Sequence, residues 1–356
     1  MAFSFGFSAE EEELDGLEQE GSFSASTAAA AATTSPPRVP SVSLSLTSLL
    51  SWLPERLSYS TVKVGGITLP RRDLFDARFQ MVCEGEEAIG VESDLIPGQY
   101  EGGLKTWECS LDLVGVLEEI GKTTSYHGKR IVERLLTTTP PASAAPTHVH
   151  LCDFNTHVLT LVTLPNLLLA YHFATAEHID DAGEIDVTDE LVEAFQASLR
   201  ERRIHLAFHA GPWEGLDLAA DESDVKLDEE AGAITTSEQP SSKAIHADLI
   251  LTSETTYNPS GIATLIEVMR NISAPSPPSS TSAPPAPLST SATTSLVATK
   301  NYYFGLGGGV HALLAGLEED DRKSGWKHAM REERAVRGGV ARSVLSVRWF
   351  GEAGRR

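Results

Sequence analysis

The stretch LTSETTYNPSG, residues 251–261, gathers residues that can do chemistry at one point of the chain. It places Ser253, Glu254 and Tyr257 directly after the apolar run ADLILT. A carboxylate accepts hydrogen bonds from substrate donors, and an aromatic ring three positions later can pack beside a cation. The structural alternative is a capped turn with an exposed Glu254, in which Pro259 helps to start the next helix. The stretch alone does not decide between the two interpretations.

A second polar pair, Asp153 and Asn155, stands at the carboxyl end of THVHLCDF, residues 147–154. An acidic residue that ends the second strand of a parallel sheet commonly binds the ribose hydroxyls of an adenosine cofactor. The alternative is a helix cap, because Asn155 or Thr156 is a good N-cap for the helix expected next. The two roles are compatible, and both are kept.

The same strand carries His148, His150 and Cys152, whose alternation places them on one face. These are metal-ligand types, but no fourth ligand is evident nearby. A strand buried on both faces can also carry such residues simply because they pack there. We therefore expect a structural role for them and no metal site.

Four glycines follow each other closely in YYFGLGGGVHALL, residues 302–314: Gly305, Gly307, Gly308 and Gly309. A phosphate-binding loop would need a Lys-Ser/Thr end, or a strand that runs directly into G-x-G-x-x-G. Here NYYF separates the preceding apolar run from the glycines, and no such lysine follows. We expect a flexible turn.

Strand and helix patterns alternate along the chain and would position these residues. Residues 100–121 space apolar side chains three or four apart, which predicts a helix with a stripe of Leu104, Trp107, Leu111, Val114 and Leu117. The expected strands are GKRIVE (128–133), THVHLCDF, RIHLAFHA (203–210), ADLILTS (247–253), SLVAT (295–299) and SVLSVRWF (343–350). Helices are expected at 155–171, about 190–200 and 261–270, with a charged helical stretch before the last strand. This order predicts an α/β fold whose mostly parallel sheet has helices on both faces and binds ligands beyond the carboxyl ends of its strands.

Composition limits the classes of function. The chain has 356 residues, of which 41% are hydrophobic and 22% charged, so it can bury a sizeable core. Its net charge of -22 argues against direct nucleic-acid binding and suits a basic protein partner. The three cysteines form no CxxC pair, so free thiols in a reducing compartment are expected.

Neither a signal peptide nor a membrane segment is expected. The start, MAFSFGFSAEEEELD, lacks a basic region. The run 158–176 is uncharged, but it contains Pro165, Asn166 and His172 and lacks flanking basic residues. A helix buried against the sheet explains this run better than a membrane span.

Residues 1–60 are acidic or rich in Ser, Ala and Pro, and we expect them to be disordered because they cannot bury enough apolar surface. Order is expected to begin near Val62. The remainder, 61–356, is expected to form one domain with insertions at about 216–246 and 274–295.

Taken together, these motifs resemble the protein-histidine methyltransferases. The matching blocks are FSFGF at the start, YEGGLKTWEC, DFN-x-x-VL-x-LVTLPN, the Trp of HAGPWEG, LTSETTYNP and TKNYYFGLGGGVH. The resemblance implies a Rossmann-like seven-stranded methyltransferase sheet and S-adenosylmethionine as cofactor. It also implies methylation of a histidine of a large-subunit ribosomal protein, in cytoplasm and nucleus. We further expect a monomer without a membrane or direct nucleic-acid partner.

The resemblance further assigns roles to individual residues. Those similar to cofactor-binding positions are Trp107, Asp153, Asn155, Gly211, Trp213 and Ser253. Glu254 and Tyr257 resemble the catalytic residues that line both the cofactor site and the substrate site. For Trp107 the alternative is a place in the apolar stripe of its helix.

One family feature is missing from the sequence. In the family, the strand that matches GKRIVE continues into a Gly-x-Gly turn and a helix before the next strand. Here only fourteen residues, 134–147, connect Glu133 to His148, and they include Pro140 and Pro141. A parallel crossover needs about a dozen residues or more, usually with a helix. The glycine turn and the front of its helix are therefore absent, and we expect the chain to bind the cofactor weakly or not at all.

Two alternatives from other classes remain. A non-catalytic binding protein could keep the substrate surface without the cofactor, although Asp153, Trp213, Glu254 and Tyr257 are all retained. A protein-lysine methyltransferase shares the Glu-x-x-Tyr signature but is disfavoured by YEGGLKTWEC.

Overall fold

The computed structural model describes residues 41–83, 102–121, 146–174, 176, 178–213, 216, 218, 246–273 and 293–351 of the chain. The strands are β1 (Val42–Leu44), β2 (Arg56–Val64), β3 (Ile67–Arg72), β4 (Thr147–Asp153), β5 (Ala182–Asp186), β6 (Ile204–Ala210), β7 (Leu249–Ser253), β8 (Thr294–Lys300), β9 (Lys327–Val336) and β10 (Arg342–Phe350). The helices are α1 (Leu46–Leu50), α2 (Leu74–Cys83), α3 (Glu108–Gly121), α5 (Thr156–Val158), the π-helix η1 (Leu159–Thr163), α6 (Leu164–His172), α7 (Asp189–Glu201), α8 (Pro259–Asn271) and α9 (Val310–Ser324). None of these helices is long and apolar enough to cross a membrane.

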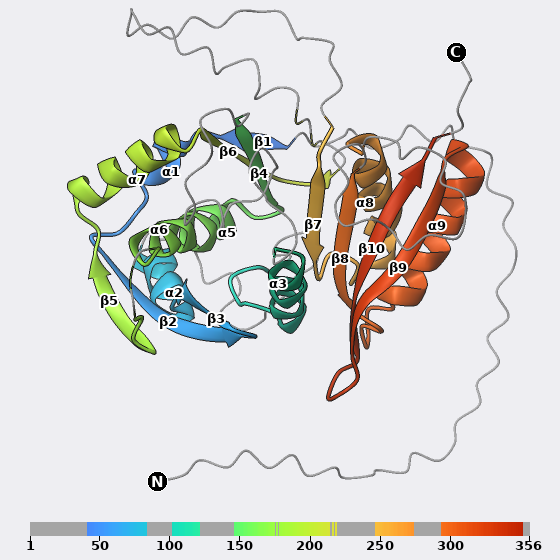
Figure 1. Cartoon of the computed structure of the whole chain (residues 1–356), viewed down its shortest axis with the longest axis horizontal. Coiled ribbons are helices and arrows are strands. Elements are labelled where there is room, and N and C mark those ends of the chain that lie inside the picture. Colours follow the sequence, from blue (N-terminus) through green and yellow to red (C-terminus); the bar gives the residue numbers. More distant parts are fainter. Residues whose placement is uncertain are drawn as a thin grey trace, which may run out of the picture. The chain divides into compact units, whose positions relative to one another are not determined.

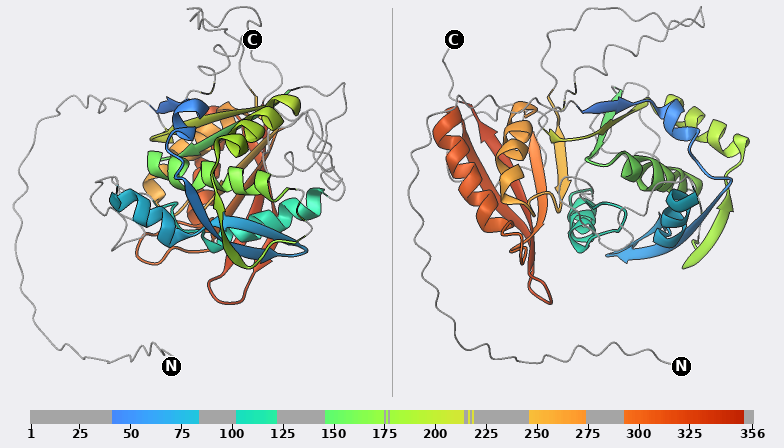
Figure 2. Two further views of the ribbon diagram at one scale, coloured as in Figure 1. Left: turned by 90° about the vertical axis from the view of Figure 1, so that its left-hand side faces the viewer. Right: turned by 180° about the vertical axis from the view of Figure 1, so that it is seen from behind.

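The four-stranded sheet, in the order β7-β8-β10-β9, has helices on both faces (Figures 1 and 2). Strand β7 runs parallel to β8, and the other two pairings are antiparallel. Alternate residues of β8 point to opposite sides: Leu296 and Ala298 pack with Leu113 of α3, whereas Val297 packs with α8 and α9. The prediction of helices on both faces is therefore confirmed for this sheet.

The first three-stranded sheet has the order β1-β6-β4, in which β6 is parallel to β4 and antiparallel to β1. The uncharged run after β4 forms a continuous helical segment, α5-η1-α6, rich in buried side chains such as Leu161 and Leu168. Its middle turn is π-helical directly before Pro165, at the first turn of α6. A proline removes a backbone donor, so the hydrogen-bond pattern shifts there. The predicted buried helix is confirmed.

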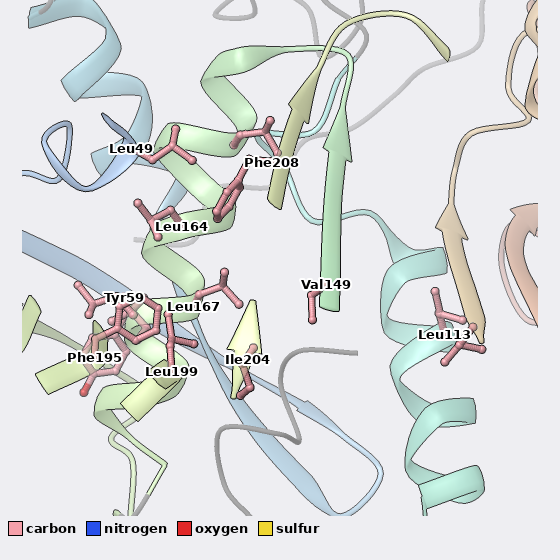
Figure 3. Close-up of a cluster of buried hydrophobic side chains, with 14 of the residues drawn as sticks. Leu49, Tyr59, Leu113, Val149, Leu164, Leu167, Phe195, Leu199, Ile204 and Phe208 are labelled. Atoms are coloured by element: carbon pink, nitrogen blue, oxygen red, sulfur yellow. The ribbon is translucent and has the colours of Figure 1, made fainter. Parts of the chain in front are cut away.

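A second three-stranded sheet, β3-β2-β5, is entirely antiparallel and was not predicted. Tyr59 of β2 reaches the large apolar cluster that also contains Leu164, Phe195 and Phe208 (Figure 3). Leu57 of the same strand belongs to this cluster as well. Strand β3 also contacts α6. This sheet helps to cover the buried helical segment.

The ladders among the described residues comprise two parallel and five antiparallel pairings, in three sheets. The fold is therefore mixed α/β, and the described sheets are not mostly parallel. Strands β4 and β7 lie at the edges of their sheets in the described part of the chain. The predicted strand GKRIVE falls outside the described residues, so a single seven-stranded sheet stays a prediction.

Two expectations require correction. Order begins before Val62, because β1, α1 and the start of β2 fall within 41–60, and Leu49 is buried in the main cluster. The charged stretch near the end is not all helix: α9 ends before Gly325, whose left-handed conformation is typical of a helix C-terminus, and β9 follows. Residues 1–40 and almost all of both predicted insertions lie outside the described residues.

Candidate active site

Residues 102–110 connect the carboxyl ends of β4 and β7. At one end of this segment, the side-chain amide of Asn155 donates to the carbonyl oxygen of Gly102 at 2.9 Å. At the other end, the hydroxyl oxygens of Ser110 and Ser253 lie 3.2 Å apart. The segment 102–110, which contains most of the block YEGGLKTWEC, thus brings together two strand ends that are distant in sequence.

Gly103 shows why this block needs glycine. Its φ of 104° lies in the left-handed region that favours glycine. A Cβ atom there would lie 3.1 Å from Oδ2 of Asp153 and 2.7 Å from a methyl group of Val158. The missing side chain therefore lets the backbone approach the Asp153 carboxylate closely.

Asp153 ends β4 with a carboxylate held by its own loop. The backbone N–H of Asn155 donates to Oδ1 of Asp153 at 2.8 Å, and the side-chain amide of Asn155 approaches the same oxygen at 3.4 Å. Burial raises the pKa of Asp153 to about 7, although both hydrogen bonds act in the opposite direction. Asn155 occupies the predicted N-cap position of α5, but its side chain makes no cap hydrogen bond there.

Glu254 follows β7 in the left-handed conformation, with φ of 59°, which is uncommon for a residue other than glycine. Its backbone N–H donates to the carbonyl oxygen of Ala298 at 2.9 Å, which anchors it to β8. Its side chain is only 13% exposed, so the exposed-turn interpretation is wrong. Strained residues of this kind cluster at functional sites.

The two carboxylate oxygens of Glu254 differ in their surroundings. Oε2 accepts a hydrogen bond from the Tyr303 hydroxyl at 2.5 Å and lies 3.9 Å from the Lys300 ammonium. Oε1 is buried, and no hydrogen bond reaches it from the described residues. In Glu254, therefore, Oε2 is fixed by a hydrogen bond, whereas Oε1 is a buried acceptor without a partner among the described residues.

Lys300 places a cation inside the site. Its ammonium lies 4.6 Å from the ring centre of Trp107 and 5.5 Å from that of Tyr303. It also lies 3.8 Å from a carboxylate oxygen of Glu108. Trp107 directly precedes α3, which begins at Glu108, later than the predicted stripe. The ring of Trp107 thus faces a positive charge.

Tyr257 joins this group through a ring contact. Its ring meets that of Tyr303 edge-on, with centroids 6.5 Å apart. Directly after it, the side chain of Asn258 accepts from the backbone N–H of Ser260, and Pro259 opens α8 as predicted. The structure therefore brings Glu254 and Tyr257 together around Tyr303.

Gly211 and Trp213 follow β6. The N–H of Gly211 donates to the carbonyl oxygen of Asp153 at 3.0 Å, with Gly211 at a φ of 119°. Trp213 is partly buried and packs against the apolar cluster that includes Ile262 of α8 and Leu313 of α9. Gly211 therefore borders Asp153, whereas Trp213 lies with the helices beside the four-stranded sheet.

The three cysteines are free, as predicted. Burial, and next the adjacent Glu254 carboxylate, raise the pKa of the Cys109 thiol above its ordinary value. A thiol that stays protonated is a poor nucleophile. Cys109 therefore stays a neutral thiol next to the Glu254 carboxylate.

The histidines of β4 pair with those of β6. His148 stacks on His205, and His150 stacks on His209, with Nδ1 of His150 3.1 Å from Nε2 of His209. Cys152 lies beside His209 in the ladder. In the described part of the chain, no group of three His, Cys, Asp or Glu residues is placed to hold a metal ion.

The glycines after β8 form a turn, as predicted, but two of them are tightly packed. A Cβ atom on Gly308 would lie 2.1 Å from the carbonyl oxygen of Thr256 and 2.2 Å from that of Tyr257. The N–H of Gly309 donates to the Thr256 carbonyl oxygen at 3.0 Å. Because these two glycines lack side chains, the turn that carries Tyr303 packs closely against the segment that carries Glu254.

Sequence reasoning missed Ser110, Lys300 and Tyr303 as site residues. A usable signal existed, because Lys300 and Tyr303 follow the predicted strand SLVAT at the sheet edge where ligands bind. Two open hollows along α7 are lined by none of the candidate residues. The candidate site therefore rests on the contacts around Glu254 and Asp153.

Comparison with known proteins gives the family. A protein from Schizosaccharomyces pombe called histidine protein methyltransferase 1 is 31% identical over 352 residues, which cover 90% of this chain and 87% of that protein. A protein of the same name from Saccharomyces cerevisiae is 26% identical, covering 78% and 76%. A homologue from Rattus norvegicus is 29% identical, covering 65% of this chain and 54% of the relative. No protein-family model matches the chain. The chain belongs to the histidine protein methyltransferase family.

Proposed function

We propose that this protein transfers a methyl group from S-adenosylmethionine to a histidine side chain of a basic large-subunit ribosomal protein. The single observation that carries the proposal is the buried, unpartnered Oε1 of Glu254 within a cluster of family motifs. The net charge of -22 supports a basic substrate. We further propose that the protein acts as a monomer in cytoplasm and nucleus.

The described residues fit the ribose and the sulfonium end of such a cofactor. The carboxylate of Asp153 would accept hydrogen bonds from the ribose, beside a backbone that Gly103 leaves free of side chain. Trp107 already faces the ammonium of Lys300, so its ring tolerates a cation of the kind that a sulfonium carries. The remaining positions proposed to line the cofactor are Asn155, Gly211, Trp213 and Ser253.

When bound, the cofactor would supply a methyl group on a positively charged sulfur: the carbon–sulfur bond would break as the new bond to nitrogen forms, a neutral thioether would leave, and the methylated imidazolium would release its proton to water. The nucleophile is a nitrogen of the substrate imidazole, which is mostly neutral at physiological pH because its unperturbed pKa is about 6.5. No strong base is needed, and the chain contributes mainly by holding the imidazole in place.

Glu254 would select the tautomer. A neutral imidazole has one N–H and one free nitrogen, so an acceptor for the N–H turns the free nitrogen toward the methyl group. The Oε1 atom of Glu254 is such an acceptor. Tyr257, edge-on to Tyr303, would pack beside the cationic sulfur.

The test is methyl transfer from labelled S-adenosylmethionine to purified large-subunit ribosomal proteins, with the products hydrolysed to amino acids. The proposal expects label in methylhistidine. The matched control is Glu254→Gln, which should retain the fold but lose most of the label. An absence of label in every amino acid at saturating cofactor would favour a non-catalytic binding protein.

A further inference from the structure

We infer that Tyr303 is a positioning residue, whose hydroxyl holds Oε2 of Glu254 so that Oε1 is left for the substrate imidazole. The inference rests on the proposed function and deepens it. It starts from the 2.5 Å hydrogen bond between Tyr303 and Glu254 and from the lack of a described partner for Oε1.

The Tyr303 hydroxyl is a fixed donor. Tyr303 is only 8% exposed. The backbone N–H of Tyr303 donates to the carbonyl oxygen of Gly308 at 3.2 Å, which closes the turn. Burial, and next the charge of Glu254, raise the pKa of Tyr303 above its ordinary value. The phenol therefore stays protonated at physiological pH and donates its proton to the carboxylate, while its oxygen accepts from the backbone N–H of Lys300 at 3.4 Å.

The surroundings of Glu254 make its two oxygens unequal. Tyr303 and the ammonium of Lys300 both approach Oε2. A buried acceptor without a partner is costly, so Oε1 would be stabilised by a donor that enters with the substrate. Without the Tyr303 hydroxyl, the Glu254 carboxylate would be free to rotate. Its Oε1 atom would then no longer be fixed in the orientation that accepts the imidazole N–H.

The variant Tyr303→Phe removes only this hydroxyl and keeps the ring contacts with Tyr257 and Lys300. Its matched control is Tyr302→Phe, the same change at the neighbouring residue, which is 49% exposed. With saturating cofactor, Tyr303→Phe should lower single-turnover methylation about tenfold, the size expected for a hydrogen bond to a charged group. The dissociation constant of S-adenosylmethionine should change by less than about twofold, and Tyr302→Phe should change neither quantity.

A double-mutant cycle with Glu254→Ala separates positioning from a structural effect. If Tyr303 acts through Glu254, adding Tyr303→Phe to Glu254→Ala should lower the residual rate no further. Thermal unfolding of the same four proteins gives a readout without cofactor, and there Tyr303→Phe should destabilise the unchanged background more than the Glu254→Ala background.

Full turnover by Tyr303→Phe, or equal losses in both backgrounds, would overturn the inference while leaving histidine methylation intact. An unchanged chain that labels no histidine would instead overturn the proposed function, and the inference with it.

Discussion

The hydroxyl group of Tyr303 donates a hydrogen bond to Oε2 of Glu254, across 49 positions of the chain. This contact joins two family motifs, LTSETTYNP and TKNYYFGLGGGVH, into one site. The first motif supplies the carboxylate and the second fixes its orientation. The proposed chemistry depends on this pairing, because a neutral imidazole needs orientation more than it needs a base.

The first prediction separates the roles of two carboxylates. Glu254→Gln should lower the turnover number at least about tenfold, because an amide is a weaker acceptor than a carboxylate for the imidazole N–H. Its cofactor dissociation constant should stay within about twofold. Asp153→Ala should weaken cofactor binding and leave the turnover number nearly unchanged, because the proposed partner of Asp153 is the ribose. Calorimetric titration and single-turnover rates measure both quantities, and equal weakening of cofactor binding by both variants with unchanged turnover would contradict this division.

The second prediction concerns pH. Burial raises the pKa of folded Asp153 to about 7, whereas an unfolded aspartate titrates near pH 4. Between these values the unfolded chain releases a proton that the folded chain keeps, so Asp153 lowers the free energy of unfolding as pH rises. The contribution is fully present below about pH 4, is lost through about pH 7, and amounts to roughly 4 kcal/mol.

The control for this prediction is Asp153→Asn, which keeps an acceptor for the Asn155 N–H but cannot ionise. Urea unfolding from pH 4 to pH 8 should show the unchanged chain losing stability relative to this variant. Parallel pH curves for the two proteins would mean that the Asp153 carboxylate has no raised pKa.

The third prediction compares two glycines. Gly308→Ala would place a methyl group against the backbone carbonyl oxygens of Thr256 and Tyr257 and should destabilise the fold by at least about 2 kcal/mol. Gly261→Ala, in α8, meets no atom within 4 Å and should stabilise by about 0.5–1 kcal/mol. Thermal unfolding measures both. If Gly308→Ala left the unfolding temperature unchanged, the turn would not pack closely against the segment that carries Glu254.

The fourth prediction concerns the short connection between residues 133 and 148. Backbone N–H groups of a glycine turn bind cofactors in ways that side chains cannot easily replace. Inserting a family-like glycine segment between Glu133 and Arg134 should tighten S-adenosylmethionine binding and raise the unfolding temperature. Calorimetric titration and thermal unfolding of both forms test this. Equal, tight binding by the two would mean that residues 134–147 already build a substitute loop.

Much of the secondary structure follows from local patterns. Strands β4, β6, β7, β8 and β10 were predicted because each is a short segment rich in apolar residues, a local pattern that needs little context. Strands β2 and β9 were missed because their exposed faces carry polar residues, as in RLSYSTVKV and KHAMREERAV. Their pairing depends on partners far away in the chain, which no local pattern contains.

In the candidate site, too, local sequence patterns identified some residues, whereas contacts between distant segments could not be predicted. Asp153 and Glu254 could be found because each ends an apolar strand. Lys300 and Tyr303 could not be assigned to Glu254, since their contacts depend on how the glycine turn folds back. Trp107 was placed on a helical stripe, yet α3 begins one residue later at Glu108. Periodicity identifies a helix more reliably than it identifies its first residue.

The most direct test of the account is the position of the transferred methyl group. The chain, at saturating S-adenosylmethionine, is incubated with large-subunit ribosomal proteins and with a peptide that contains lysine but no histidine. Peptide mass spectrometry should place the methyl group on a histidine of a basic ribosomal protein and leave the lysine peptide unmodified. A methyl group found on lysine would contradict the histidine assignment.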